Sequence, residues 1–600
     1  MKYCDSPYIY RRRPSREITI GRPGHGGLTL GGDTPVVMQS MLTCDTMDTA
    51  ACVQQTEDLV AVGCQIVRIT APTVKDAANL EQVVQQLRQR GCHVPIVADI
   101  HFKPEAAMEA AKWVEVVRIN PGNYADSKKF NIREYSDDQY LAELTRIEEK
   151  FTPLVKLSVE KGRAMRIGTN HGSLSDRIMN RFGDSPLGMV ESALEFARIA
   201  RKNGFHQFKF SMKSSNPKVM IQCYRLLAAR LAELGSDWNY PLHLGVTEAG
   251  EGEDGRIKSA IGIGSLLCDG IGDTIRVSLT EDSPNEIAVC RDLLAQISTL
   301  VNTSHEVPNL ELSYDPFRFE RRSTPEVDLG MDGVRCGHEQ TIRVVVTRAT
   351  WDKVAPKIRP KDDVRPEAIY EDLNIQEVDP REDFSVACDT QLITVKDGLD
   401  LAPITAFRLL AARLKRLGRN NPILLKDCLK FESTPLAPNI ALLRASIVIG
   451  ALLCDGIGDA ILVRGESGAG QSLRLAFNIL QAAGCRSFKT DYVACPSCGR
   501  TLFNLQTVTA RIKARTAHLK GVKIAIMGCI VNGPGEMADA DFGYVGGAPN
   551  KINLYVGKNA VKFNIPEGEA VERLVDLIRE HGKWVEPDPG NETVRLATTA

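Results

Sequence analysis

The sequence predicts an α/β protein with three parts: an N-terminal (β/α)8 TIM barrel, an inserted degenerate second TIM-like barrel, and a small C-terminal α+β domain. Three observations support this prediction. Short β-like runs alternate with helical stretches from residue 36 to residue 277, two blocks of sequence recur further along the chain, and three cysteines gather near its end, between 495 and 529. We expect the domains to span 1–297, 298–483 and 484–600.

The first part contains eight β-like runs separated by amphipathic helical stretches such as 50–62 and 80–90. The runs span 36–38, 65–69, 95–99, 116–120, 165–168, 207–211, 242–246 and 273–277. Eight successive βα units are typical of a TIM barrel, in which the strands close into a cylinder. A doubly wound open sheet is the alternative for the same pattern.

Polar side chains gather at the ends of most of these runs. They are Arg68, Asp99, His101, Arg118, Asn120, Arg166, Asn170, Lys213, Thr247, Glu248, Arg276 and Ser278. In a barrel the carboxyl ends of the strands meet at one mouth, where active sites are built. A single strand-end arginine is more often a solvated rim charge, but five cationic residues on five runs predict a pocket for a small polyanion such as phosphate.

An internal repeat identifies the second part. The block YRLLAARL at 224–231 recurs as FRLLAARL at 407–414, and LLCDGIGD at 266–273 recurs unchanged at 452–459. Two such matches in nearly one register predict a second, incomplete barrel. The copy has lost the Thr-Glu pair and other strand-end polar residues, so we expect a scaffold rather than a second active site. We also expect a linker over 301–328 and a solvated surface segment over 360–382.

The C-terminal part carries a candidate metal site. Cys495 and Cys498 have the C-x-x-C spacing that points two thiolates the same way, and Cys529 follows the apolar run 522–527. Glu536 ends a Gly-Pro-Gly loop just beyond. A zinc ribbon needs four nitrogen or sulfur ligands, whereas three thiolates with one other ligand suit an iron–sulfur cluster. The alternative is a zinc knuckle at Cys495 and Cys498, with Cys529 as a core thiol.

Composition limits the classes of function. The 600-residue chain has a formal net charge of −1, which argues against a strongly basic nucleic-acid-binding surface. Residues 1–13 are not followed by an apolar signal segment, and no apolar run is long enough to span a membrane. The 16 cysteines are scattered as in a cytoplasmic protein with reduced thiols. We therefore expect no nucleic-acid or membrane partner.

Six motifs together resemble a known enzyme family. They are ADIHF at 98–102, VRINPGN at 117–123, MRIGTNHGSLS at 165–175, GVTEAG at 245–250, CPSCGR at 495–500 and GCIVNGPGE at 528–536. These motifs are similar to those of 4-hydroxy-3-methylbut-2-enyl diphosphate synthase, the iron–sulfur enzyme of the non-mevalonate isoprenoid pathway. The additional barrel resembles the three-domain form found in plants and some bacteria.

The resemblance implies a reaction and a cofactor. The family opens the ring of 2-C-methyl-D-erythritol 2,4-cyclodiphosphate by a two-electron reduction with loss of water, and it uses one 4Fe-4S cluster per chain. Reduced ferredoxin or flavodoxin is the expected electron donor. The cluster ligands implied by the motifs are Cys495, Cys498, Cys529 and Glu536. The C-terminal part is accordingly expected to be an iron–sulfur domain.

The resemblance also implies roles at the barrel mouth. The diphosphate-binding residues would be Arg68, Arg118, Asn120, Arg166, Asn170, Lys213, Arg276 and Ser278. Glu248 is expected to donate a proton or to orient a hydroxyl group. Asp99 and His101 are expected either to assist the substrate hydroxyls or to orient a neighbouring arginine.

Two questions stay open at this point. In two-domain relatives the cluster domain closes over the barrel of the other subunit in a homodimer. In this chain the closure is expected either within one chain or between the subunits of a homodimer. The alternative function is a zinc-ribbon-bearing scaffold or nucleic-acid-binding protein.

Overall fold

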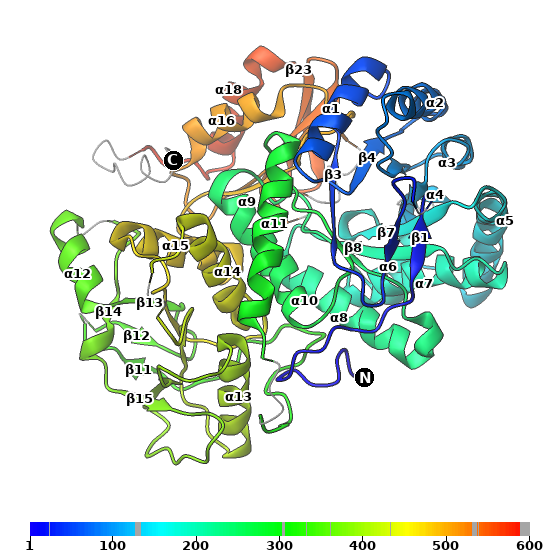
Figure 1. Ribbon diagram of the computed structural model, residues 1–600. Helices are drawn as coiled ribbons and strands as arrows, with labels where there is room; N and C mark the ends of the chain where they lie inside the picture. The colour runs from blue at the N-terminus through cyan, green and yellow to red at the C-terminus, as the bar shows by residue number, and fades with distance from the viewer. Residues whose placement is uncertain are drawn as a thin grey trace.

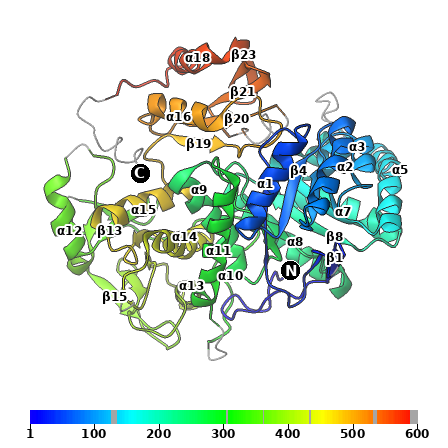
Figure 2. The ribbon, with the colours of Figure 1, turned by 45° about the horizontal axis from the view of Figure 1, so that its top comes forward.

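A computed structural model describes residues 1–22, 24–125, 134–302, 307–331, 333–359, 362–431, 434–530, 537 and 539–587 of the chain. Figure 1 shows three parts of the chain. The first barrel, coloured blue to green, and the second unit, coloured green to yellow, lie side by side. The C-terminal domain, coloured orange to red, lies across the top of the barrel in Figures 1 and 2.

The first barrel consists of eight parallel strands. They are β3 (Val37–Met41), β4 (Ile66–Thr70), β5 (Ile96–Asp99), β6 (Val116–Ile119), β7 (Ala164–Asn170), β8 (Phe208–Lys213), β9 (His243–Leu244) and β10 (Thr274–Ile275). Their order is β8-β7-β6-β5-β4-β3-β10-β9, and a parallel bridge between Phe210 and Leu242 joins the two edges. Each predicted run coincides with one strand. The TIM barrel prediction is confirmed, because an open doubly wound sheet would leave the edges apart.

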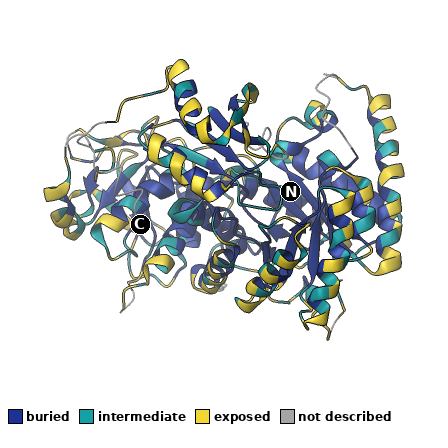
Figure 3. Cartoon of the chain, turned by 90° about the horizontal axis from the view of Figure 1, so that it is seen from above, coloured by how far each residue is buried: buried dark blue, intermediate teal, exposed yellow. Residues whose placement is uncertain are grey.

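Helices surround this cylinder and bury its strands. They are α1 (Thr49–Ala61), α2 (Val74–Gln89), α3 (Pro104–Ala110), α4 (Pro121–Tyr124), α5 (Asp137–Lys161), α6 (Asp176–Phe182), α7 (Pro186–Lys202), α8 (Pro217–Leu234), α9 (Gly252–Ser259), α10 (Ser265–Cys268) and α11 (Ser283–Leu300). Figure 3 shows exposed positions on the outer helices and buried positions on the strands. Within the described ranges, none of the helices is both long and apolar enough to cross a membrane.

A short hairpin closes the amino-terminal end of the barrel. Strands β1 (Ile18–Ile20) and β2 (Leu28–Leu30) pair antiparallel. Their apolar side chains form one buried cluster with Ile66, Val97 and Val116, which lie near the starts of barrel strands. Because this end is filled, the opposite end, where the strands finish, is the mouth available for a site.

The second unit repeats this architecture with fewer strands. Its elements are the hairpin β11 (Val327–Asp328) and β12 (Arg335–Cys336), the strands β13 (Arg343–Val346), β14 (Ala368–Ile369), β15 (Ile375–Val378), β16 (Leu392–Val395), β17 (Leu424–Lys426) and β18 (Ala460–Leu462), and the helices α12 (Arg348–Val354), α13 (Pro403–Arg416), α14 (Pro438–Cys454) and α15 (Ala469–Ala482). The sheet β14-β13-β18-β17 is parallel, β15 pairs with β16, and a bridge between Ile393 and Ile423 connects the two. The strands follow the cyclic order of a barrel, with no pairing between β14 and β15 in the described part of the chain.

The repeat extends into the segment predicted from the sequence to be a linker. In the first barrel, Arg12 Nη2 lies 3.2 Å from Asp273 Oδ1, and Ser15 Oγ donates to the same oxygen at 2.7 Å. In the second unit, Arg321 Nη2 lies 3.2 Å from Asp459 Oδ1, and Thr324 Oγ1 donates to that oxygen at 2.8 Å. The prediction of a linker over 301–328 is therefore wrong for its second half, because that half anchors the repeat.

The segment 360–382 also differs from its prediction. It contains β14 and β15, although its many charges suggested a solvated surface segment. One of those charges, Glu367, is buried and pairs with Arg343 at 3.0 Å and with Arg486 at 2.7 Å. Strands of two to four residues that lie among charged residues show no clear alternation, so the sequence carried no strand signal here.

The two barrels pack together through residues that the repeat relates. A Cβ atom added to Gly264 would overlap Ile447, and one added to Gly450 would overlap Ile261. The differences 450 − 264 and 447 − 261 are both 186, so each unit presents the same glycine and isoleucine to the other. The contact therefore has the self-complementary form of a two-fold dimer interface within one chain.

Replacing Gly264 by alanine should lower the free energy of unfolding by about 1–3 kcal/mol, because the added methyl group overpacks the contact with Ile447. Chemical denaturation measures the change. The control is Gly470→Ala in α15, where an added Cβ meets nothing within 4 Å. That substitution should change the free energy of unfolding by no more than about 0.5 kcal/mol. Equal effects in both variants would show that the contact between the barrels is loose.

Four buried charged side chains cross the same interface. Arg225 pairs with Asp269 at 2.8 Å and with Asp455 at 2.7 Å. Arg408 pairs with both aspartates at 2.8 Å. Burial lowers the pKa values of Arg225 and Arg408, but the two aspartates outweigh it and hold both values well above the usual range. Each arginine bridges one carboxylate of its own unit and one of the other, so the network carries no net charge.

The C-terminal domain is a five-stranded mixed sheet with helices packed on it. Its elements are β19 (Asp491–Ala494), α16 (Leu505–Thr516), β20 (Lys523–Met527), β21 (Phe542–Ala548), β22 (Lys551–Val556), β23 (Asn559–Pro566) and α18 (Glu567–Glu580). Strands β19, β20 and β21 are parallel, and β22 and β23 continue the sheet antiparallel. A parallel bridge between Ala249 and Ala494 places the edge strand β19 at the barrel mouth, as Figure 2 shows.

Candidate active site

A cavity lies between the barrel mouth and the C-terminal domain. It is lined by Met41, Arg68, Arg118, Arg166, Asn170, Lys213, Thr247, Glu248, Arg276, Ser278, Cys495, Pro496, Cys498, Arg500, Met527 and Cys529. All the predicted anion-binding residues except Asn120 are among them, together with Glu248 and the three predicted cysteine ligands. Residues from both ends of the chain therefore meet in one place.

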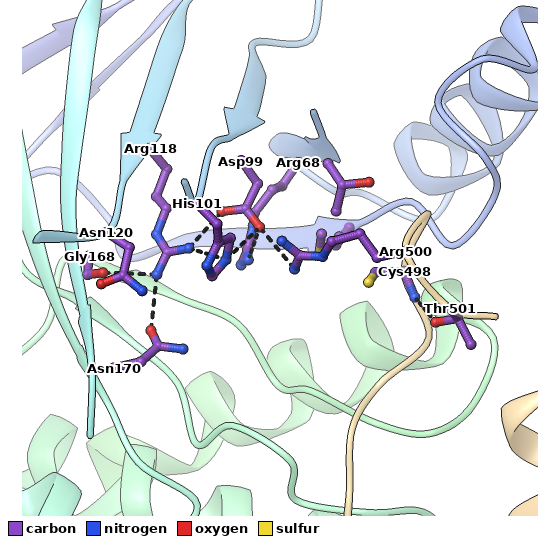
Figure 4. Close-up of polar contacts among 12 residues, drawn as sticks. Arg68, Asp99, His101, Arg118, Asn120, Gly168, Asn170, Cys498, Arg500 and Thr501 are labelled. Atoms are coloured by element: carbon purple, nitrogen blue, oxygen red, sulfur yellow. Dashed lines mark hydrogen bonds and ion pairs between the residues drawn. The ribbon is translucent and has the colours of Figure 1, made fainter. Parts of the chain in front are cut away.

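Asp99 is the centre of a buried network beside this cavity (Figure 4). Its Oδ2 accepts a hydrogen bond from Arg68 Nη2 at 2.7 Å, and its Oδ1 accepts one from Arg118 Nη1 at 2.9 Å. His101 Nε2 lies 2.6 Å from Arg118 Nη1. Asp99 and His101 contact arginines and do not line the cavity themselves. This geometry favours the role of orienting an arginine over direct contact with substrate hydroxyls.

Neighbouring charges set the protonation of this network. Burial raises the pKa of Asp99, but Arg68 and Arg118 outweigh it and hold that pKa well below its usual value. Burial, followed by the positive charge of Arg118, lowers the pKa of His101 to about 3. His101 is therefore neutral at neutral pH, and its Nε2 accepts the hydrogen bond from Arg118.

Arg118 is also held from the neighbouring strand β7. Its Nη2 donates to the carbonyl oxygen of Gly168 at 2.8 Å and to Asn170 Oδ1 at 3.0 Å. A Cβ atom on Gly168 would lie 2.6 Å from Arg118 Nε, so glycine leaves room for the guanidinium. Asn120 does not join this group. Its Nδ2 donates to Ser173 Oγ at 2.8 Å, and Asn120 does not line the cavity.

Arg166 and Lys213 lie among groups of the same charge. Burial, with Arg68 and Arg118 nearby, lowers the pKa of Arg166 well below its usual value. Burial, with Arg68 and Arg276 nearby, does the same for Lys213. Arg166 Nε and Nη1 are buried and have no hydrogen-bond partner in the described part of the chain. An anion that brings both charge and acceptor oxygens would offset the cost of burying these cations.

Glu248 lies on the cavity wall with a strained backbone. Its φ is 50°, which is uncommon for a residue with a side chain. Its Oε2 is buried and has no hydrogen-bond partner among the described residues. Burial raises its pKa, although Thr247, Lys213 and Arg276 act in the opposite direction. The carboxyl group therefore keeps its proton to a higher pH than an exposed glutamate does.

Two neighbouring parallel strands present the cysteines. Cys495 follows β19 directly, and Cys529 follows Gly528 at the end of β20. Because these strands pair in parallel, their carboxyl ends lie side by side. The backbone N–H of Gly528 donates to Cys495 Sγ at 3.2 Å, a contact that stabilises a thiolate. The pairing of β19 with β20 therefore brings Cys495 and Cys529, which lie in separate sequence motifs, to the same edge of the cavity.

This donor set suits a group held by thiolates. Cys495, Cys498 and Cys529 line one cavity together with Arg500. Burial raises the pKa of the Cys495 thiol, so binding a metal there must release its proton. Of the residues whose positions are described, no three His, Cys, Asp or Glu side chains are grouped so as to hold a metal ion. Glu536, the predicted fourth ligand, lies outside the described residues.

Two family models match this chain. The GcpE TIM-barrel domain matches residues 16–291, and the GcpE protein C-terminal domain matches residues 491–580. A protein of Akkermansia muciniphila named 4-hydroxy-3-methylbut-2-en-1-yl diphosphate synthase (flavodoxin) is 58% identical, and the alignment covers 98% of this chain and 99% of that one. The chain belongs to the GcpE family.

Further GcpE relatives match over comparable lengths. The protein of the same name from Protochlamydia amoebophila is 45% identical over 98% of this chain and 99% of its own length. A rice protein named 4-hydroxy-3-methylbut-2-en-1-yl diphosphate synthase (ferredoxin), chloroplastic, is 41% identical over 98% of this chain and 89% of its own. The family resemblance predicted from the six motifs is confirmed.

Two residues of this GcpE site were not predicted from the sequence. Glu286 of α11 accepts hydrogen bonds from Arg276 Nε and Nη2, both at 3.0 Å, and so fixes the plane of that guanidinium. Arg500 Nη2 lies 3.4 Å from Asp99 Oδ2, which joins the C-terminal domain to the barrel network. The position of Arg500 in the CPSCGR motif could have identified it as a site residue. Glu286 lies within a helix, where no sequence motif marks it as part of the site.

In this GcpE chain the C-terminal domain contacts the barrel of the same chain. Thr280 Oγ1 donates to the carbonyl oxygen of Cys495 at 3.1 Å, and Lys258 Nζ donates to Asp491 Oδ1 at 2.9 Å. The cysteines are thereby brought over the mouth without a second subunit. Of the two arrangements left open by the sequence, the structure has the one within a single chain.

Proposed function

We propose that this chain converts 2-C-methyl-D-erythritol 2,4-cyclodiphosphate into 4-hydroxy-3-methylbut-2-enyl diphosphate. The reaction opens the ring, consumes two electrons and two protons, and releases one water molecule. The main support is the cavity, in which cationic side chains of the barrel face three cysteines of the C-terminal domain. A diphosphate matches the cations, and a reducing centre matches the cysteines.

The proposed cofactor is one 4Fe-4S cluster per chain. Cys495, Cys498, Cys529 and Glu536 would hold it, in keeping with the three thiols that line the cavity. When bound, the cluster supplies the electrons of the reduction, which it receives from reduced flavodoxin or ferredoxin. Both donors occur in the names of the relatives, flavodoxin for the bacterial proteins and ferredoxin for the rice protein.

The barrel residues would hold the substrate and move a proton. We assign diphosphate binding to Arg68, Arg118, Arg166, Asn170, Lys213, Arg276 and Ser278, all of which line the cavity. Glu248, with its raised pKa, donates a proton to the hydroxyl group that leaves as water. Asp99 and His101 position Arg118. The docked C-terminal domain excludes bulk water from the reacting centre.

We propose that the chain has three domains with separate roles, at 1–297, 298–483 and 484–600. The first binds the substrate, the last carries the iron–sulfur cluster, and the middle part is a degenerate barrel that acts as a scaffold. The repeated contacts of Gly264 and Gly450 support this scaffold role, because they occupy a surface that would otherwise be exposed. We propose a cytoplasmic location, since the described cysteines form no disulfide.

Anaerobic purification with iron and sulfide assays tests the cofactor. The protein should be brown and hold about four irons per chain. Cys529→Ala should lose most of the iron, because one thiolate ligand is removed. Cys388→Ala is the matched control, since this cysteine is exposed in the second unit and should keep the full iron content.

Turnover of the cyclic diphosphate with reduced flavodoxin or ferredoxin tests the reaction itself. The expected product is 4-hydroxy-3-methylbut-2-enyl diphosphate, with two electrons consumed per molecule. A colourless protein that binds zinc and shows no turnover would instead support the zinc-ribbon scaffold or nucleic-acid-binding protein.

A further inference from the structure

Arg500 brings a cationic side chain into the cavity from the C-terminal domain. It comes two residues after Cys498, and its side chain is only 8% exposed although it lies between two domains. Figure 4 shows it pointing from the cysteine-bearing loop toward Asp99. The other cationic lining residues, such as Arg118 and Arg166, all belong to the barrel. The cation set is therefore complete only when the two domains are docked.

The guanidinium of Arg500 keeps unused donors. Its Nη2 is 3.4 Å from Asp99 Oδ2, an oxygen that already accepts from Arg68 Nη2 at 2.7 Å. Its Nε and Nη1 are buried and lack a hydrogen-bond partner among the described residues. Leaving buried charged donors unmet is costly, because their hydration is lost without replacement. Acceptor oxygens supplied by a ligand in this cavity would remove that cost.

The backbone around Arg500 sets the direction of its side chain. A Cβ atom on Gly499 would lie 2.6 Å from the carbonyl oxygen of Cys44 and 2.7 Å from Thr70 Oγ1, so this stretch lies directly against the barrel rim. The backbone N–H of Cys498 donates to Thr501 Oγ1 at 3.1 Å, which closes a tight turn around Arg500. The turn belongs to the C-terminal domain itself, whereas the close approach of Gly499 to Cys44 and Thr70 exists only in the docked arrangement, so docking places the Arg500 side chain at the mouth.

We propose that Arg500 binds the diphosphate of the substrate directly and couples its binding to the seating of the C-terminal domain on the barrel. This inference rests on the proposed function for the identity of the diphosphate. The planar guanidinium suits two phosphate oxygens at once. The cationic side chains of the barrel bind the anion at the mouth. Arg500 adds a contact with the anion from the cysteine-bearing domain, and it can do so only when that domain is docked. Substrate binding and domain seating thus stabilise each other.

Isothermal titration calorimetry on the reconstituted protein tests the contact with two probes, the cyclic diphosphate and inorganic pyrophosphate. Arg500→Gln should raise the Kd of both by about 10- to 100-fold, the range for losing charge-assisted hydrogen bonds. The Kd values of Arg500→Lys should lie between those of the wild type and Arg500→Gln, because lysine keeps the charge and loses the bidentate geometry. Iron content should stay at the wild-type value in both variants.

The matched control is Lys513→Gln. Lys513 Nζ pairs with Glu251 Oε1 at 2.9 Å across the same domain boundary but does not line the cavity. Loss of this ion pair should change the Kd of each probe by no more than about threefold, as for other partly exposed ion pairs. Hydrogen exchange supplies a second readout. Pyrophosphate should protect the backbone of 495–501 in the wild type and in Lys513→Gln, and protect it less in Arg500→Gln.

Unchanged pyrophosphate affinity in an Arg500→Gln protein with normal iron content would overturn the proposal. A weakened affinity with normal iron content supports it. The two probes separate this result from the proposed function. If the wild type binds pyrophosphate and not the cyclic diphosphate, the proposed substrate is wrong, and the role of Arg500 is judged from pyrophosphate alone.

Discussion

Replacing Glu248 by glutamine should lower kcat by at least about 100-fold while leaving the iron content unchanged, as expected for the loss of a general acid. The amide has the same shape but carries no transferable carboxyl proton. Glu248 lines the same cavity as the cysteines, and its Oε2 has no hydrogen-bond partner among the described residues, so it is available to the substrate. Steady-state turnover with saturating reductant measures the loss.

The dependence of kcat on pH tests whether Glu248 donates a proton. Burial raises the pKa of Glu248, so the protonated form persists above the usual range of a glutamate. If this proton is donated, kcat falls as pH rises through the raised pKa. Glutamine does not titrate there, so the residual activity of the variant should lack this decline.

Glu251→Gln is the control for this experiment. Glu251 lies three residues further along and pairs with Lys513 at 2.9 Å, outside the cavity lining. Its turnover should stay within about threefold of the wild type, because a partly exposed ion pair contributes little. Full activity of Glu248→Gln would remove this residue from the mechanism.

Replacing Asp269 by alanine should lower the free energy of unfolding by about 3–5 kcal/mol, the typical cost of breaking a buried ion network from one side. Asp269 accepts from Arg225 and Arg408 at 2.8 Å each, and its side chain is fully buried. Without it, two buried guanidiniums share the single carboxylate of Asp455. The two barrels should separate more easily, and chemical denaturation followed by circular dichroism measures the loss.

The control is Asp389→Ala. Asp389 pairs with Arg419 at 3.0 Å, but the two side chains are 48% and 38% exposed. Water and salt screen such a pair, so the variant should lose less than about 1 kcal/mol. A similar small loss in Asp269→Ala would mean that the buried network does not hold the barrels together.

The parts of the fold that were predicted correctly share a physical property. The strands β4 to β8 are buried on every face, so each reads as a short, mostly apolar run with polar residues such as Arg68 or Lys213 at or near its carboxyl end. The errors share another property. The strands β14 and β15 are short and lie among charges, and Arg321 anchors its unit through one ion pair with Asp459, which leaves no periodic pattern to find.

The candidate site shows the same division. Arg118 and Cys495 were recognised because strand ends and the C-x-x-C spacing are local patterns. Asn120 was included for the same reason, although its amide donates to Ser173 Oγ at 2.8 Å and the residue does not line the cavity. Glu286 was missed because a carboxylate within a helix has no distinctive local context. Local patterns identify the elements that carry chemistry, and they do not report the direction of each side chain.

The sequence by itself determined the barrel class, the internal repeat, the family and most of the residues that line the cavity. Only the tertiary structure decided which of them touch. The carboxylate of Asp99 lies within 3.4 Å of donors from Arg68, Arg118 and Arg500, which come from three separate segments. The physical reason is that sequence periodicity reports which face of an element is buried. The partner on that face depends on strand order and on how the domains dock.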